Sequence, residues 1–331
     1  MRKLFTFLIA LGAIVFVNLS APAVHAGCVI GGGFICPSPS SGVCTQATNF
    51  LARVAALPAT LDTTHTNAYT NMICGLVTDG VITGTMNGAN SGSGACGSYI
   101  DALYVFATNT TSGTNTSAAL LNLCGTSYTA SPQNSPTFAA DQGYTGLAAS
   151  SQYVNLGFNP STATTPNYVR NCSMIAAYDR TNRSTTQTYT SIGAGQGGVY
   201  SYIQPYRVSG GNHVNVELNA ATFPYVGSTI STSQGFQAAI RASSSTIDFY
   251  LNSNSTPVTT GASSNSTGLP NTQFNILQIG GSGSYSSDQI AAAVIGGFSG
   301  TCPSTATWGP IWQSISSRIN AYMTALGTNV Y

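Results

Sequence analysis

Charge is what this sequence has least of. Only 5% of its 331 residues are Asp, Glu, Lys or Arg, with a single lysine, Lys3, and a single glutamate, Glu217. Nucleic-acid binding needs clustered cations that neutralise phosphates, so this composition argues against a nucleic-acid partner. So few charges also protect poorly against self-association.

Long apolar runs are equally scarce, because only one occurs and it lies at the start. Arg2 and Lys3 precede an apolar stretch over residues 4–17, and small residues lead up to Ala26. The stretch is too short to span a bilayer comfortably, and the pattern is typical of a secretory signal peptide cleaved after Ala26. We therefore expect a protein that is secreted or held at the cell surface, extracellular or periplasmic, without a transmembrane segment.

Cys28 leaves a second processing route open. Small residues also precede the lipidated cysteine of a lipoprotein signal, but the aliphatic residue expected three places earlier is here His25. The sequence favours ordinary cleavage and leaves lipidation at Cys28 undecided. Cleavage after Ala26 would leave seven arginines against eight acids, a net charge of −1 by count.

Cysteine is the residue type that best fits the export signal. An even number of cysteines in an exported chain predicts a disulfide framework. The eight are Cys28, Cys36, Cys44, Cys74, Cys96, Cys124, Cys172 and Cys302. We predict one pairing, Cys74 with Cys96, because these two bracket a Gly/Ser/Asn-rich loop over residues 83–94 that a bridge would close at its base. No CxxC pair or histidine cluster accompanies them, so the sequence predicts neither a metal site nor a cofactor.

Apolar periodicity divides the chain into five segments. These are a signal peptide (1–26), a Cys/Gly/Pro-rich extension (27–44), a helical segment with the pinned loop (45–98), a β-domain (99–300) and a C-terminal helix (301–331). In the helical segment one apolar stripe ends at Pro58, and Asp62 is placed to cap a second helix. In the last segment Thr307 can cap a helix with Pro310 in its first turn, and Gly327 ends it. We expect this helix to pack on the β-domain beside the other two.

Short runs with a period of two dominate from Tyr99 onward. Val214, Val216 and Leu218 share one strand face, and the same alternation sets Asp248 and Tyr250 apart from their apolar neighbours. Such runs predict half-buried antiparallel strands. The ten candidates are 99–107, 153–158, 173–178, 186–192, 199–206, 213–219, 236–242, 246–251, 274–279 and 290–295. The glycine clusters at 193–198 and 280–283 are interpreted as hairpin turns. The fold class predicted is a mainly-β, two-sheet antiparallel jelly-roll sandwich.

Seven segments occur in an order that resembles a known group of proteins. They are TNAY (66–69), DALYVFAT (101–108), ALLNL (119–123), SPTF (135–138), DQGYTG (141–146), LGFNP (156–160) and RINAYMTA (318–325). Together they resemble a group of largely uncharacterised proteins of alphaproteobacteria and their prophages. That group is similar to the concanavalin A-like lectin/glucanase superfamily, whose laminin-G-like members are jelly rolls.

This resemblance covers about residues 46–331 and implies the sandwich rather than a function. The superfamily includes lectins, glycan-binding modules, glycosidases and structural capsid or fibre domains, and fold alone does not choose among them. The chain departs from the group in its signal peptide, its cysteines and the insertion at 83–94.

Catalytic chemistry finds few candidates. A glycosidase needs two carboxylates that face the scissile bond, and the E-x-D-x-E strand motif of the superfamily's glucanases is absent. Glu217 and Asp248 lie on polar faces of separate predicted strands and would have to meet across one concave sheet. A serine hydrolase would need His65 or His213 as its base; we place His65 at the surface of a first helical turn, and no G-x-S-x-G elbow occurs. We predict no catalytic residue.

Tyrosine offers the best candidates for a binding face. An exposed tyrosine ring can stack on a sugar while amides and carboxylates bind its hydroxyls, although aromatic residues also pack across strands. Four tyrosines lie in or beside the predicted strands: Tyr200, Tyr202, Tyr206 and Tyr250. The candidate ligand-binding residues are Asn215, Glu217, Asp248, Tyr250 and Tyr202.

The leading hypothesis is a secreted, disulfide-stabilised, non-catalytic jelly-roll protein that binds surface glycan or cell-envelope material. The alternative is a self-associating structural subunit of an extracellular filament, layer or matrix. A glycoside hydrolase is the least favoured of the three.

Overall fold

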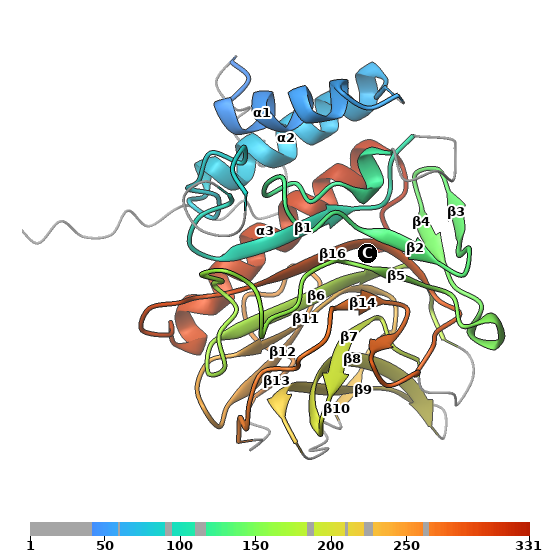
Figure 1. The fold of residues 1–331 in the computed structure, drawn as a ribbon, viewed down its shortest axis with the longest axis vertical. Helices are drawn as coiled ribbons and strands as arrows, with labels where there is room; N and C mark the ends of the chain where they lie inside the picture. Colours follow the sequence, from blue (N-terminus) through green and yellow to red (C-terminus); the bar gives the residue numbers. More distant parts are fainter. Residues whose placement is uncertain are drawn as a thin grey trace, which may run out of the picture. The chain divides into compact units, whose positions relative to one another are not determined.

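A computed structural model describes residues 42–58, 60–89, 95–109, 117–183, 189–208, 211–221, 228–260 and 265–331. Over these residues the chain forms two eight-stranded sheets and three α-helices (Figure 1). The helices are α1 (Thr45–Ala55), α2 (Thr63–Thr78) and α3 (Thr305–Ala325). Two single-turn 3₁₀ helices span Ala118–Leu120 and Ala148–Ser150. The predicted mainly-β sandwich is confirmed.

The sheet that faces the helices is called sheet I. Its strands, in spatial order, are β13 (Thr259–Thr260), β12 (Ile247–Leu251), β11 (Gly235–Arg241), β6 (Ser173–Asp179), β16 (Gln289–Gly297), β4 (Gly143–Thr145) and β3 (Thr137–Ala139), and β1 (Ile100–Val105) also pairs with β16. All its pairings are antiparallel.

The opposite sheet is called sheet II. Its strands, in spatial order, are β10 (Ser228–Ile230), β9 (Gly211–Ala220), β8 (Val199–Val208), β7 (Ile192–Gln196), β14 (Asn275–Ile276), β5 (Tyr153–Asn155) and β2 (Ser131–Gln133). Its eighth strand, β15 (Ile279–Gly280), pairs with β7 in the parallel sense, and the other pairings are antiparallel.

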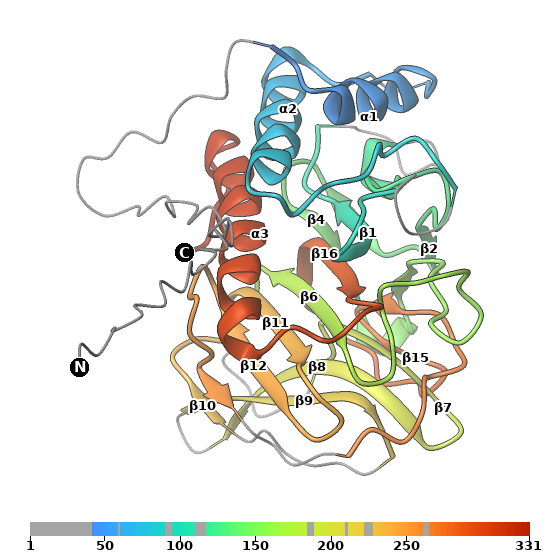
Figure 2. The ribbon, with the colours of Figure 1, turned by 90° about the vertical axis from the view of Figure 1, so that its left-hand side faces the viewer.

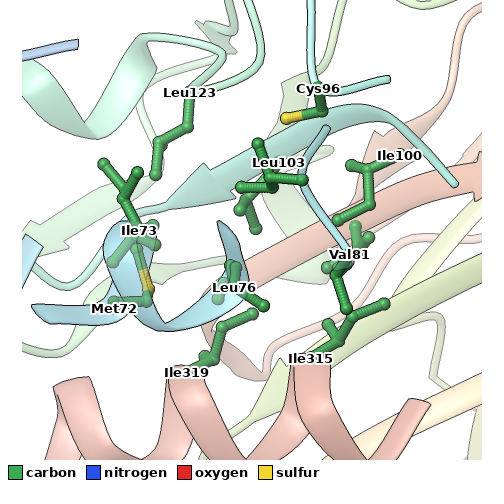
Figure 3. Close-up of a cluster of buried hydrophobic side chains, with 14 of the residues drawn as sticks. Met72, Ile73, Leu76, Val81, Cys96, Ile100, Leu103, Leu123, Ile315 and Ile319 are labelled. Atoms are coloured by element: carbon green, nitrogen blue, oxygen red, sulfur yellow. The ribbon is translucent and has the colours of Figure 1, made fainter. Parts of the chain in front are cut away.

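Two apolar layers hold these elements together. The first fills the space between the sheets, with Phe106, Ile175, Ile203 and Phe249 among its buried members. The second lies between sheet I and the helices (Figures 2 and 3). Because each fully buried Leu or Ile side chain contributes about 1.5–3 kcal/mol, both layers are major sources of stability. Sheet I is therefore buried on both sides.

The second layer joins α2 and α3 to sheet I. In Figure 3, Ile73 and Leu76 of α2 and Ile319 of α3 converge on Leu103 of β1. The prediction that the C-terminal helix packs on the sandwich beside the N-terminal helical segment is confirmed by the many contacts between α2 and α3. No helix among the described residues is long and apolar enough to cross a membrane.

Two of the predicted helix ends are confirmed, and one predicted helix start is wrong. Asp62 caps α2 as predicted, since its carboxylate accepts the His65 backbone N–H at 2.8 Å. Gly327, at φ +69°, follows the last turn of α3 as predicted. The start of α3 is three residues earlier than predicted, with Ser304 rather than Thr307 at the N-cap, so Pro310 lies in the second turn.

The disulfides correct one prediction. Cys44 pairs with Cys74, Cys96 with Cys124, and Cys172 with Cys302. Cys74 with Cys96 is therefore wrong, because backbone hydrogen bonds close the base of the loop instead: the N–H groups of Thr83 and Gly84 donate to the Cys96 carbonyl. Cys28, Cys36 and the predicted signal peptide lie outside the described residues.

One predicted turn is a strand. Gly193 and Gly195 lie within β7, and the hairpin is formed by Gly197 and Gly198, both at positive φ. Glycine is required in the strand because a Cβ at Gly195 would collide with the Tyr200 ring, and one at Gly193 would lie 3.0 Å from the Cβ of Tyr202. The strands that the sequence missed have two or three residues each, too few to show alternation: β2, β3, β4, β10 and β13.

Candidate ligand-binding face

The outward side of β8 and β9 brings together six polar and aromatic side chains. In the ladder Tyr202 is opposite Glu217, Gln204 is opposite Asn215, and Tyr206 is opposite His213. The residues that alternate with them, such as Ile203, Val214 and Val216, are buried between the sheets. The six therefore point away from the sandwich core. They are called the sheet II face: Tyr202, Gln204, Tyr206, His213, Asn215 and Glu217.

Only one end of this face is accessible. Tyr206, His213 and Asn215 are half-buried, whereas Tyr202 and Glu217 are 2% and 1% exposed. The rings of Tyr206 and His213 stack with their centroids 5.3 Å apart and their planes inclined by 25°. The accessible end thus presents an aromatic stack beside an amide.

The amides of the sheet II face differ in how they are bonded. Gln204 donates through Nε2 to Thr190 Oγ1 at 2.9 Å. Asn215 Oδ1 is buried and has no hydrogen-bond partner among the residues described. An unpaired buried oxygen costs about 1–3 kcal/mol.

Glu217 has a structural interaction that its sequence position does not suggest. Arg241 of β11 reaches across the sandwich and donates through Nε to the Leu218 carbonyl at 2.8 Å. Burial lowers the pKa of Arg241 to about 10, and the negative charge of Glu217 opposes that shift. Glu217 therefore helps to balance a buried guanidinium. The contact of Glu217 with a ligand stays a prediction, and only 1% of the residue is exposed.

The alternation in the sequence predicts that Asp248 and Tyr250 face solvent. In the structure they do not. Both are fully buried beneath α3. Asp248 Oδ2 accepts from Thr305 Oγ1 at 2.6 Å, and Tyr250 donates from its hydroxyl to the Thr305 carbonyl at 3.4 Å. Burial raises the pKa of Asp248, which the hydrogen bond from Thr305 partly opposes.

The five candidate binding residues are therefore divided between two sheets. Asn215, Glu217 and Tyr202 belong to the sheet II face, and Asp248 and Tyr250 belong to the helix side of sheet I. Glu217 and Asp248 point away from each other across the sandwich, so they cannot act together on one glycosidic bond. The hypothesis of a glycosidase built on this pair is wrong.

His65 is buried rather than at the surface. It is 4% exposed, with Nδ1 2.8 Å from Asp62 Oδ1 and Nε2 2.7 Å from Asp141 Oδ1. Asp141 belongs to the turn between β3 and β4, so the imidazole ties the first turn of α2 to that hairpin. Both ring nitrogens have partners, which leaves neither available as a catalytic base.

The structure contains a buried ionic cluster that the sequence did not predict. Arg183 pairs with Asp288 and lies 3.5 Å from Asp179, while Ser191 and Ser286 donate to the two carboxylates at 2.8 and 2.6 Å. Burial raises the pKa of Asp179 and of Asp288, and the positive charge of Arg183 opposes both shifts. Because Asp288 is 105 residues from Arg183 in the sequence, no local pattern could have revealed their pairing.

Other features of the described residues offer less for binding. No three His, Cys, Asp or Glu side chains of this part of the chain gather as a metal site. A shallow, open hollow lies between the β12–β13 connection and α3, where its lining residues are Ser253, Asn254, Ser255, Thr256, Pro257, Val258 and Gln313.

Comparisons with known proteins give a distant likeness of fold. No protein-family model and no curated protein matches the chain. Domain 4 of a GH43 extracellular arabinanase from Geobacillus stearothermophilus, solved with arabinotriose, is 12% identical over 66% of this chain and 99% of that domain, with a TM-score of 0.40. Trypanosoma rangeli sialidase is 11% identical over 77% of this chain and 39% of its own, with a TM-score of 0.44.

The botulinum neurotoxin serotype D binding domain is a third structure of this kind. It is 10% identical over 65% of this chain and 50% of its own, with a TM-score of 0.38. The chain thus spans half or less of the toxin and sialidase structures. At such scores the likeness carries no argument about function.

Proposed function

We propose that this protein is a secreted, non-catalytic glycan-binding protein whose ligand lies on the accessible end of the sheet II face. The observation that carries the proposal is the stack of Tyr206 and His213 beside the half-buried amide of Asn215. Sugar rings have an apolar face that packs on aromatic side chains and hydroxyls that donate to amide oxygens. The two features on one strand pair match these two halves of a sugar.

The disulfides support the proposed location. Three bridges join described cysteines, and bridges of this kind persist in oxidising compartments outside the cytoplasm. A protein exported to such a compartment meets polysaccharide of the cell surface and envelope, which we propose as the source of the ligand.

The alternative of a self-assembling structural subunit gains no specific support. The outermost strands in the order of the two sheets, β13, β3, β10 and β2, have two or three residues each. The outer edge of β1 is occupied, since the Leu103 carbonyl accepts from Leu123 N and the Leu103 N–H donates to Asn122 Oδ1. Short or covered edges are poor templates for adding strands from another copy. Sedimentation that shows large, concentration-dependent oligomers would revive this alternative.

The proposal is tested by a glycan array followed by pull-down on envelope polysaccharide. We expect the wild-type protein to be retained, and Tyr206→Ala to weaken retention by about tenfold, because it removes the stacking surface. Asn215→Ala removes the unpaired acceptor and should weaken retention by a few-fold.

Tyr285→Ala provides the matched control. Tyr285 is also half-buried, but it lies beside Tyr153 of β5, towards the other end of the sheet II strand order. We expect this variant to bind as the wild type does. Failure of the wild type to bind any glycan, or equal retention of wild type and Tyr206→Ala, would contradict the proposed site.

A further inference from the structure

We infer that the glycan bound on the sheet II face is an uncharged polysaccharide, with neither acidic groups nor amines. This inference rests on the proposed function and narrows its ligand. Its basis is the set of internal partners that the described arginine side chains bind.

Six arginine side chains that the structure describes bind the chain's own acceptors. Arg53 donates to three backbone carbonyls at the 122–125 turn, and Arg241 donates to the carbonyls of Leu218 and Ser244. Burial lowers the pKa of each of these two to about 10, which shows how far both guanidinium groups are removed from water.

The other described arginine side chains are engaged in the same way. Arg170 donates to the Ser266 carbonyl, and Arg180 donates to the Thr328 carbonyl and to Gln289. Arg183 and Arg318 pair with Asp288 and Asp79. Since Lys3 is the only lysine, these six side chains account for most of the positive charge of the chain. Each would have to abandon internal partners to meet an anion.

The sheet II face has no accessible cation or carboxylate among its six members. Its accessible members present a ring stack and an amide. Thr229 of β10, which is exposed and opposite His213, adds only a hydroxyl. Glu217 is 1% exposed, and its charge acts on Arg241.

This distribution of charge selects against ionic ligands. Sulfate, phosphate and uronate groups are bound in proteins by charge-assisted hydrogen bonds from Arg or Lys, and an amino sugar needs a carboxylate. A charged sugar placed on the sheet II face would lose hydration without gaining an opposite charge. A neutral sugar carries no charged group whose hydration would be lost.

The test is affinity electrophoresis or titration calorimetry of the full-length secreted protein with two sets of polymers. The neutral set is dextran, amylose, mannan, galactomannan and laminarin; the charged set is alginate, polygalacturonate, heparin and chitosan. We expect binding to at least one neutral polymer, with a dissociation constant that changes less than about twofold between about 20 mM and about 500 mM NaCl.

Two variants test whether the sheet II face is the binding site and whether a positive charge contributes to the affinity. Tyr206→Ala should weaken the binding by about tenfold. Arg207→Gln, which removes the positive charge next to Tyr206 in the sequence, should leave the dissociation constant within about twofold of the wild type.

The outcomes separate the two proposals. Binding confined to a charged polymer, weakened by salt and by Tyr206→Ala, overturns the neutral ligand and keeps the proposed function. A large loss of affinity in Arg207→Gln with retained folding also overturns the neutral ligand. Binding to neither set, or binding that Tyr206→Ala leaves intact, overturns the proposed function and the inference that rests on it.

Discussion

Strands β9 and β12 look alike in the sequence and have different surroundings in the structure. Each alternates apolar residues with polar or aromatic ones, and each turns its apolar side towards the core between the sheets. The polar side of β9 is partly open at His213 and Asn215, whereas α3 covers Asp248 and Tyr250 of β12. Alternation therefore identifies which side faces the sandwich core, but it does not show whether the other side meets water.

The difference arises from the helices. Sheet I has an apolar second face, on which Trp308, Trp312 and Ile315 of α3 pack. Trp312 contacts Phe236 of β11 at 4.8 Å between centroids and donates to the Asn252 carbonyl at 2.9 Å. The described part of sheet II has no comparable layer of helices over its outward side. We therefore propose the binding function for sheet II and a structural role for the helix side of sheet I.

The largest expected effect comes from releasing the helix cover. The Cys172–Cys302 bridge joins the start of β6 to the segment that leads into α3, with 130 residues between its ends. Replacing both cysteines by alanine should lower the free energy of unfolding by about 5 kcal/mol. The same change at Cys44 and Cys74, which are 30 residues apart, should cost about 1 kcal/mol less. Urea unfolding of both variants measures this ranking, and the reverse order would show that the cover does not depend on that bridge.

The second prediction compares two tyrosines that both lie on the side of a strand facing away from the core between the sheets. Tyr250→Ala opens a cavity under α3 and should cost about 3 kcal/mol of unfolding free energy. Tyr206→Ala removes a half-buried ring and should cost less than about 1 kcal/mol. Chemical denaturation of the two variants makes the comparison, and similar losses would mean that the outward sides of the two sheets are not distinct.

The smallest effect concerns pH. Burial raises the folded-state pKa of Asp248, so this carboxyl contributes stability that is fully present below about pH 4 and is lost as the pH rises through the raised value. Asp248→Asn should therefore become more stable relative to the wild type as the pH rises. Unfolding free energies measured from about pH 3 to about pH 7 give the difference curve.

Asp62→Asn provides a control of opposite sign. The His65 backbone N–H lowers the pKa of Asp62, so its contribution is present above about pH 4 and is lost as the pH falls through the lowered value. This variant should become less stable relative to the wild type as the pH rises. Two difference curves of the same sign would contradict the environments described for these carboxylates.

What could be predicted from the sequence depends on the range of the interaction. Asp62 as a cap and Gly327 as a helix end are decided within one turn of helix, and both are confirmed. The alternation of β9 is decided within one strand, and it is confirmed as well. The Cys74–Cys96 pairing failed because loop closure is also achieved by backbone hydrogen bonds, which have no signature in side-chain identity.

The candidate site could be predicted only in part for the same reason. The sequence predicts one ligand-binding set of five residues, of which the ladder of β8 and β9 brings together only Tyr202, Asn215 and Glu217. No local pattern shows that Arg241 approaches Glu217 from the opposite sheet, or that Asp141 binds His65 over 76 residues. Those contacts follow from strand order.

The sequence by itself determined the mainly-β class, the local ends of the helices and the inward side of each long strand, because hydrophobic periodicity and capping act between near neighbours. Only the tertiary structure decided which polar sides are covered, which cysteines pair and where the arginines find acceptors. These outcomes depend on elements up to more than a hundred residues apart that meet when the two sheets and the helices pack.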